Sequence, residues 1–165
     1  MRKTHFIRST RACYGASYKK ELKTKFEYME ITVKKSIDDF SFIASNGEKN
    51  IALAAGPKLS GENSSFRPMQ LLLASLGGCM SIDIMMILKK QRQKVHNLEI
   101  KVIGDRVDGT PAYFNKIVIE VHVKGDVKEE KLQQAIRLSE EKYCSVYHSL
   151  RQDGEITTKY ILNGY

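Results

Sequence analysis

Hydrophobic and polar residues alternate along three short stretches in the first half of the chain. These stretches are Glu30–Lys35, Asp39–Ser45 and Asn50–Ala54. Alternation with a period of two is typical of half-buried strands, and Ser36–Asp38 and Asn46–Gly47 supply turn residues between the stretches. We therefore predict a three-stranded antiparallel meander, followed by a polar loop over Gly56–Phe66.

A long apolar segment comes next, from Pro68 to Arg92, and its one acidic residue is Asp83. Proline is favoured at the first position of a helix, so we predict a helix over this segment. About 20 apolar residues are enough to cross a membrane. However, the segment also contains several polar or small residues in its interior: Gln70, Ser75, Gly77, Gly78, Ser81 and Asp83. We therefore expect a helix buried at the centre of a domain or dimer, and no membrane span.

Two further alternating stretches cover Leu98–Val107 and Ala112–Lys124, with Asp-Gly-Thr-Pro between them. Four apolar residues of the second stretch lie on one face of a strand, and charged residues lie on the other. The apolar residues are Ile117, Ile119, Val121 and Val123. This pattern predicts a half-buried antiparallel hairpin.

The last part of the chain combines a helical pattern with one more strand pattern. Asp126 precedes Glu129 by three residues, an arrangement typical of a capping box at a helix start. Apolar residues then recur at helical spacing as far as Leu150, Asp153–Gly154 end the pattern, and Glu155–Leu162 alternate as a strand. The order βββ-α-ββ-α-β with antiparallel connections predicts an α+β fold, in which antiparallel sheets pack on the long buried helix.

The charge of the chain is concentrated at its beginning. The 165 residues carry a formal net charge of +8, and residues 1–26 hold eight basic side chains against one acidic side chain. The rest of the chain is nearly neutral, so we expect no nucleic-acid-binding face. We divide the chain into a basic extension over residues 1–28 and a single domain over residues 29–165. The extension resembles a transit peptide in composition, but we favour an extension that packs on the body or on a partner chain, or a start that is really Met29.

The sequence holds three cysteines, Cys13, Cys79 and Cys144, and lacks GxGxxG, GxxxxGK[ST], CxxC and HExxH motifs. An odd number of cysteines and no secretory signal favour a reducing, cytoplasmic location. Cys79 and Cys144 fall on the two predicted helices, where they are either buried apolar residues or a redox pair. Cys144 and His148 share a helix face and could form half a zinc site. No second close pair completes a tetrahedron, so we expect no metal and no other cofactor.

Two segments resemble the OsmC/Ohr family of small cysteine-based peroxidases. PMQLLLASLGGCMSIDIMMILKKQRQ, which begins at Pro68, resembles the family's central helix, in which the reactive cysteine follows the first proline by eleven positions. LSEEKYCSVYHSL, which contains Cys144, resembles the helix of the second cysteine. The resemblance covers about residues 29–165 and is greatest to an OsmC-like branch with GGC…ID…R and YCSV motifs.

The resemblance implies a mechanism and a quaternary structure. Cys79 would attack the O–O bond of an organic hydroperoxide and become a sulfenic acid. Cys144 would then form a disulfide with it, which a dithiol reductant reopens. The family also implies an intertwined homodimer with its active sites at the subunit interface. The alternative is a non-catalytic or thiol-sensing OsmC-like protein that binds an apolar ligand in the dimer cleft.

The reactive thiol needs a group that favours its ionised form. Cys79 lies about 16 Å along the helix from Pro68, too far for the helix dipole to act. Family members use an Arg from the first strands and a Glu after the helix proline, but this chain has Ser-Ile-Asp-Asp and Met69–Gln70 at those places. The candidates for activating or supporting roles are therefore other residues: Arg67, Gln70, Asp83, Arg92 and Arg106.

Two of these candidates, Arg67 and Asp83, carry a specific expectation, and so do three methionines of the same helix. Arg67 begins about 18 Å from Cys79, so it could reach the thiol only across a dimer interface. Asp83 by itself would raise the pKa of the Cys79 thiol, and a buried Asp so placed is expected to pair with an Arg. Met69, Met80 and Met86 are either ordinary core residues or a flexible apolar wall for the substrate.

Overall fold

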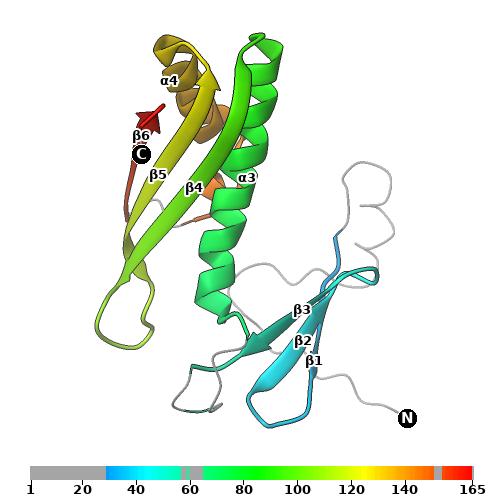
Figure 1. Cartoon of the computed structure of the whole chain (residues 1–165). Helices are drawn as coiled ribbons and strands as arrows, with labels where there is room; N and C mark the ends of the chain where they lie inside the picture. Colours follow the sequence, from blue (N-terminus) through cyan, green and yellow to red (C-terminus); the bar gives the residue numbers. More distant parts are fainter. Residues whose placement is uncertain (1–28, 57–58, 60–64, 151–153, 165) are drawn as a thin grey trace, which may run out of the picture. The chain divides into compact units, whose positions relative to one another are not determined.

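The computed structural model describes residues 29–56, 59, 65–150 and 154–164 (Figure 1). The basic extension and most of the expected polar loop lie outside the described residues. The chain divides into two compact units between Ser65 and Phe66, and each unit is described by itself. The expected single domain over residues 29–165 stays a prediction.

The first unit is a three-stranded antiparallel sheet in the order β1-β2-β3. Its strands are β1 (Thr32–Lys35), β2 (Ser41–Ser45) and β3 (Asn50–Ala54). Asp38 holds the first turn, because its carboxylate accepts hydrogen bonds from the Phe40 backbone N–H and the Ser41 hydroxyl. In the second turn, Gly47 has φ of +95°, which glycine adopts without strain. The predicted meander is confirmed.

The second unit places helices on one face of a second three-stranded sheet (Figure 1). In chain order its elements are α3 (Pro68–Lys90), β4 (Lys94–Arg106), β5 (Phe114–Asp126), α4 (Glu129–Leu138), the π-helical turn η1 (Ser139–Tyr143), α5 (Ser145–Ser149) and β6 (Glu155–Leu162). Alternate residues of β5, among them Ile119 and Val121, are buried in one core with Leu76 and Ile84 of α3 and Leu132 of α4. The sequence therefore forms one apolar layer between sheet and helices, as the α+β prediction requires.

The strands of the second unit confirm the predicted hairpin and correct the prediction for the last strand. β4 and β5 pair antiparallel over most of their length. β6 pairs with β5 in parallel, with Ile117 opposite Ile156 and Val121 opposite Tyr160. The expectation of antiparallel connections throughout was wrong here. The helical segment between β5 and β6 carries the chain back along the sheet, as a parallel pairing needs.

The start of the second helical segment also differs from the prediction. Asp126 is the last residue of β5 and pairs with Lys94, so it does not cap a helix. The helix α4 begins at Glu129 after Lys128, whose backbone N–H donates a 2.9 Å hydrogen bond to the Gln93 side chain. The predicted capping box was wrong because the β ladder extends through Asp126.

The predicted helix that reaches Leu150 is interrupted in the middle. At Ser139 the hydrogen-bond pattern widens by one residue, and the Cys144 N–H donates to the Ser139 carbonyl at 2.8 Å. Cys144 itself has an extended backbone, with φ of −72° and ψ of 95°, and α5 begins after it. Such a π-helical turn inserts one extra residue and is frequent at functional sites. The prediction of an unbroken helix was therefore wrong at the second cysteine.

One face of α3 is buried in the second unit and another is exposed. Leu76, Met80 and Ile84 are buried in the core, whereas Ile82 is 63% exposed and Met86 is 50% exposed. By length and composition, α3 is the one helix in the described part of the chain that could cross a membrane. Within the second unit, its buried face packs in one core with β5 and α4.

The glycine pair on α3 marks a close approach of the sheet. A Cβ atom on Gly77 would lie 3.1 Å from a methyl carbon of Val102, so β4 packs directly on the helix there. A Cβ atom on Gly78 would meet nothing within 4 Å. The close neighbour of α3 at Gly77 is therefore a strand.

Candidate functional site

Cys79 and Asp83 lie one turn apart on α3 and share a face of the helix, because residues four apart in a helix are neighbours. The Cys79 side chain is half-buried, and Asp83 is only 8% exposed. The same face carries Leu76 and Met80, which are fully buried. Burial of this face therefore places the Cys79 thiol and the Asp83 carboxylate at the edge of the core.

Cys144 reaches the same place through the π-helical turn. Its side chain is fully buried. Its sulfur caps the short helix α5, because it accepts a 3.4 Å hydrogen bond from the Tyr147 backbone N–H. The extended backbone at Cys144 thus fixes the direction of its side chain.

The folded chain brings these three residues together. The sulfur atoms of Cys79 and Cys144 and a carboxylate oxygen of Asp83 all lie within 4.8 Å of one another. The Cys79 thiol lies close enough to raise the pKa of the Cys144 thiol. The sequence separates the cysteines by 65 positions, so tertiary packing alone creates this neighbourhood. The catalytic roles expected for them stay predictions.

The surroundings keep Cys144 in its neutral form. Burial raises the pKa of the Cys144 thiol to about 11, and the neighbouring Cys79 thiol and the Asp83 carboxylate act in the same direction. The Tyr147 N–H opposes this increase because it stabilises the thiolate. At neutral pH the Cys144 sulfur therefore carries its proton.

Ser139 is a part of the site that the sequence did not reveal. Its side chain is fully buried, and its hydroxyl donates a 3.1 Å hydrogen bond to Asp83. A serine inside a helical pattern gives no signal of such a role. The start of the π-helical turn at Ser139 would have indicated this role, but the spacing of apolar residues does not predict that turn.

The expected activating residues lie elsewhere. Arg67 is exposed at the start of α3, where its backbone N–H donates to the Gln70 side chain at 2.9 Å. Arg92 is exposed in the turn after α3, and the Arg106 guanidinium donates to the Ala112 carbonyl near the end of the β4–β5 hairpin. Within the described ranges, Asp83 forms no ion pair with a Lys or Arg. The expected Asp–Arg pair is therefore not found there.

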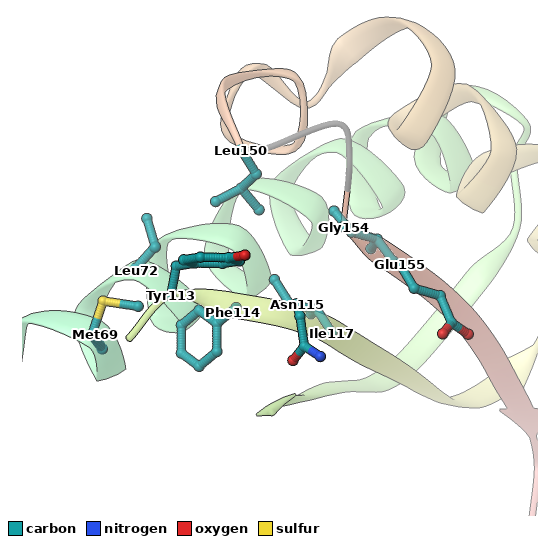
Figure 2. A pocket seen from close by; sticks show the side chains of 10 residues that line it. Met69, Leu72, Tyr113, Phe114, Asn115, Ile117, Leu150, Gly154 and Glu155 are labelled. Carbon is teal, nitrogen blue, oxygen red and sulfur yellow. The ribbon is translucent and has the colours of Figure 1, made fainter. Parts of the chain in front are cut away.

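An apolar cavity of about 80 Å³ lies beside the first turns of α3 (Figure 2). Met69 and Leu72 point toward it from α3. Tyr113, just before β5, and Phe114, its first residue, face it, and Leu150 approaches it from just after α5. Neither cysteine lines this cavity.

Of the three methionines expected at a substrate wall, Met69 lines this cavity. Met80 is fully buried in the core instead. Met86 lies half-exposed on the other side of α3.

Sequence comparison identifies relatives of this chain. Residues 61–159 match the family model described as OsmC-like protein. The chain is also 39% identical over 94 residues to protein YhfA of Escherichia coli K12. This alignment covers 56% of the chain and 70% of YhfA.

Structure comparison finds the same fold in solved proteins. A hypothetical protein from Aquifex aeolicus VF5 has a TM-score of 0.72 and 30% identity, over 83% of this chain and 98% of that one. An organic hydroperoxide resistance protein OsmC from Legionella pneumophila has a TM-score of 0.63 over 81% of this chain and 96% of that one. At 14% identity, the second likeness concerns the fold alone.

Proposed function

The chain belongs to the OsmC-like protein family, and we propose that it is a thiol-dependent peroxidase that reduces organic hydroperoxides. The observation that carries this proposal is the proximity of the Cys79 and Cys144 thiols, whose sulfurs lie within 4.8 Å of each other. A disulfide needs a sulfur separation of about 2 Å, so a small movement suffices to form one. The Legionella protein of this fold is named for organic hydroperoxide resistance, which supports organic hydroperoxides as the substrate class.

The proposed reaction uses two electrons from the two thiols. The Cys79 thiolate attacks the O–O bond, which yields an alcohol and a sulfenic acid on Cys79. The Cys144 sulfur then attacks the sulfenic acid, water leaves, and a disulfide remains. A dithiol reductant restores both thiols by exchange. Because this step needs a reducing pool, we assign the protein to the cytoplasm.

The two cysteines divide these roles according to their burial. Cys79 is half-buried and accessible to a hydroperoxide, whereas Cys144 is fully buried and has a raised pKa. A buried neutral thiol is a poor first nucleophile but is well placed to trap a sulfenic acid that forms beside it. We therefore assign the first attack to Cys79 and the resolving step to Cys144.

We further propose that the active unit is a homodimer. The exposed face of α3 carries the large apolar residues Ile82, Met85 and Met86, a surface that a second copy would cover. A second copy would also supply the cation that Cys79 needs, and Arg67 is our candidate. Sedimentation equilibrium should give twice the chain mass of 18.8 kDa. A monomer at micromolar concentration would contradict this part of the proposal.

Activity is tested by hydroperoxide consumption. The whole chain, supplied with a dithiol and cumene hydroperoxide, should consume the hydroperoxide much faster than the dithiol does alone. The variant Cys13→Ser is the matched control and should retain this activity, because Cys13 has no role in the proposed pair. Consumption at the rate of the free dithiol would refute the proposal.

The apolar cavity favours a second candidate function, the binding of an apolar small molecule without turnover. In that case the chain would bind a small apolar probe such as xenon saturably and consume no hydroperoxide. Leu72→Asp should then abolish binding, because it places a charge in the cavity wall. Binding that survives this variant would exclude the cavity as the ligand site.

A further inference from the structure

We propose that the reduced chain binds one zinc ion between Cys79, Asp83 and Cys144. This site is independent of the peroxidase proposal, because it needs the three side chains but no reaction with a hydroperoxide. The sequence suggested Cys144 and His148 as half a zinc site. In the fold, Cys144 instead lies beside Cys79 and Asp83 of α3, so these three residues are the proposed ligands.

The geometry of the three donor atoms is close to that of a zinc site. A tetrahedral zinc ion with Zn–S bonds of about 2.3 Å places two sulfur ligands about 3.8 Å apart. The donor atoms of this group lie within 4.8 Å of one another, so a contraction of about 1 Å completes the arrangement. The fourth position would be open to water on the half-buried Cys79 side.

Electrostatics also favours a cation at this place. Asp83 is 8% exposed, and the hydrogen bond it receives comes from the uncharged Ser139 hydroxyl. Buried carboxylates are normally paired with a cation or coordinate a metal. The described part of the chain gives Asp83 no ion pair with Lys or Arg, so a divalent ion would supply the missing positive charge.

The donor set selects the kind of metal. Two thiolates and one carboxylate favour zinc over magnesium or calcium, which prefer sites made of oxygen ligands. Three protein ligands with an open fourth position are typical of zinc sites that admit a small molecule.

The neighbours of the three ligands hold them as a metal site requires. The Ser139 hydroxyl orients the Asp83 carboxylate, and the Tyr147 N–H orients the Cys144 sulfur. Hydrogen bonds from neighbouring groups fix the orientation of metal ligands, and loss of such a bond typically lowers metal affinity by about 10–100-fold. Zinc and a hydroperoxide would compete for the same two sulfurs.

The test is zinc titration of the reduced chain without an affinity tag, in competition with a chromophoric chelator. We expect one zinc ion per chain. Cobalt in place of zinc should give the intense visible bands of a tetrahedral ion and a near-ultraviolet thiolate band. Asp83→Asn should weaken zinc binding more than tenfold, and Ser139→Ala by about 10–100-fold. Cys79→Ser and Cys144→Ser should each weaken or abolish the thiolate band, because each variant removes one of the two thiolate ligands.

Two controls separate this site from surface binding and from misfolding. Asp126→Asn changes an exposed carboxylate elsewhere in the second unit and should leave affinity unchanged. Circular dichroism shows whether each variant is folded, and the nearly isosteric Asp83→Asn keeps the test decisive if a cysteine variant unfolds. Zinc binding that survives Asp83→Asn and Cys79→Ser, or no stoichiometric binding at all, would overturn the proposal.

Discussion

Replacing Cys79 with Ser should abolish hydroperoxide turnover, whereas replacing Cys144 with Ser should leave a single turnover per chain. The first variant lacks the nucleophile, because a serine hydroxyl does not replace a thiolate at neutral pH. The second keeps the nucleophile but lacks the thiol that resolves the sulfenic acid. Cys79→Ser should therefore show no hydroperoxide turnover, and Cys144→Ser should stop after one turnover per chain.

Rapid mixing with one equivalent of cumene hydroperoxide distinguishes these outcomes. Cys144→Ser should accumulate a sulfenic acid on Cys79 that dimedone traps, and the wild-type chain should not, because its Cys144 consumes the sulfenic acid. Cys79→Ser should give no trapped product at either position. A sulfenic acid on Cys144 in the Cys79→Ser chain, with activity retained, would reverse the assigned roles.

Deleting Glu141 should separate the two cysteines while the fold persists. Glu141 is exposed within the π-helical turn, whose extra residue sets the direction of Cys144. Without that residue, the chain from Glu129 can continue as a regular helix. A shift of one residue rotates a helical side chain by about 100°, which turns the Cys144 sulfur away from Cys79. We expect hydroperoxide turnover to fall to the level of the Cys144→Ser variant.

The matched control is Glu141→Ala, which removes the same side chain but keeps the number of residues in the turn. It should retain turnover and disulfide formation. Far-ultraviolet circular dichroism and thermal unfolding of the deletion variant show whether its fold is intact. If the folded deletion variant forms the disulfide at the wild-type rate, the π-helical turn does not set the cysteine geometry.

The sequence pattern predicted regular elements well where local signals were strong. Pro68 marks the start of α3, and β3 and β6 have the predicted bounds of Asn50–Ala54 and Glu155–Leu162. In these segments the turn residues and the period of apolar positions agree, so local preference and tertiary packing favour the same structure.

The errors fall where tertiary interactions override local signals. Asp126 has the spacing of a helix cap, but the β ladder with Lys94 extends through it. The apolar spacing up to Leu150 fits an unbroken helix, yet the chain inserts a wider turn at Ser139. One inserted residue changes the phase of the pattern by about 100°, but the segment after it is too short to show that change in its apolar spacing.

The candidate site was predictable in part. The resemblance identified Cys79 and Cys144 as partners, and their contact follows from the packing of α3 against the chain around η1. The Ser139–Asp83 hydrogen bond depends on the same packing and had no sequence signal. No arginine fills the expected place beside Asp83 in the described residues, and a second copy or a metal ion would supply the positive charge.

The most direct test of the central claim is the location of the disulfide after reaction with one equivalent of organic hydroperoxide. The chain has three cysteines, and the account predicts that the number of free thiols falls from three to one. Peptide mapping by mass spectrometry should find a Cys79–Cys144 bond within a single chain, with Cys13 free. Three free thiols after treatment, or a bond that involves Cys13 or joins two chains, would contradict the account.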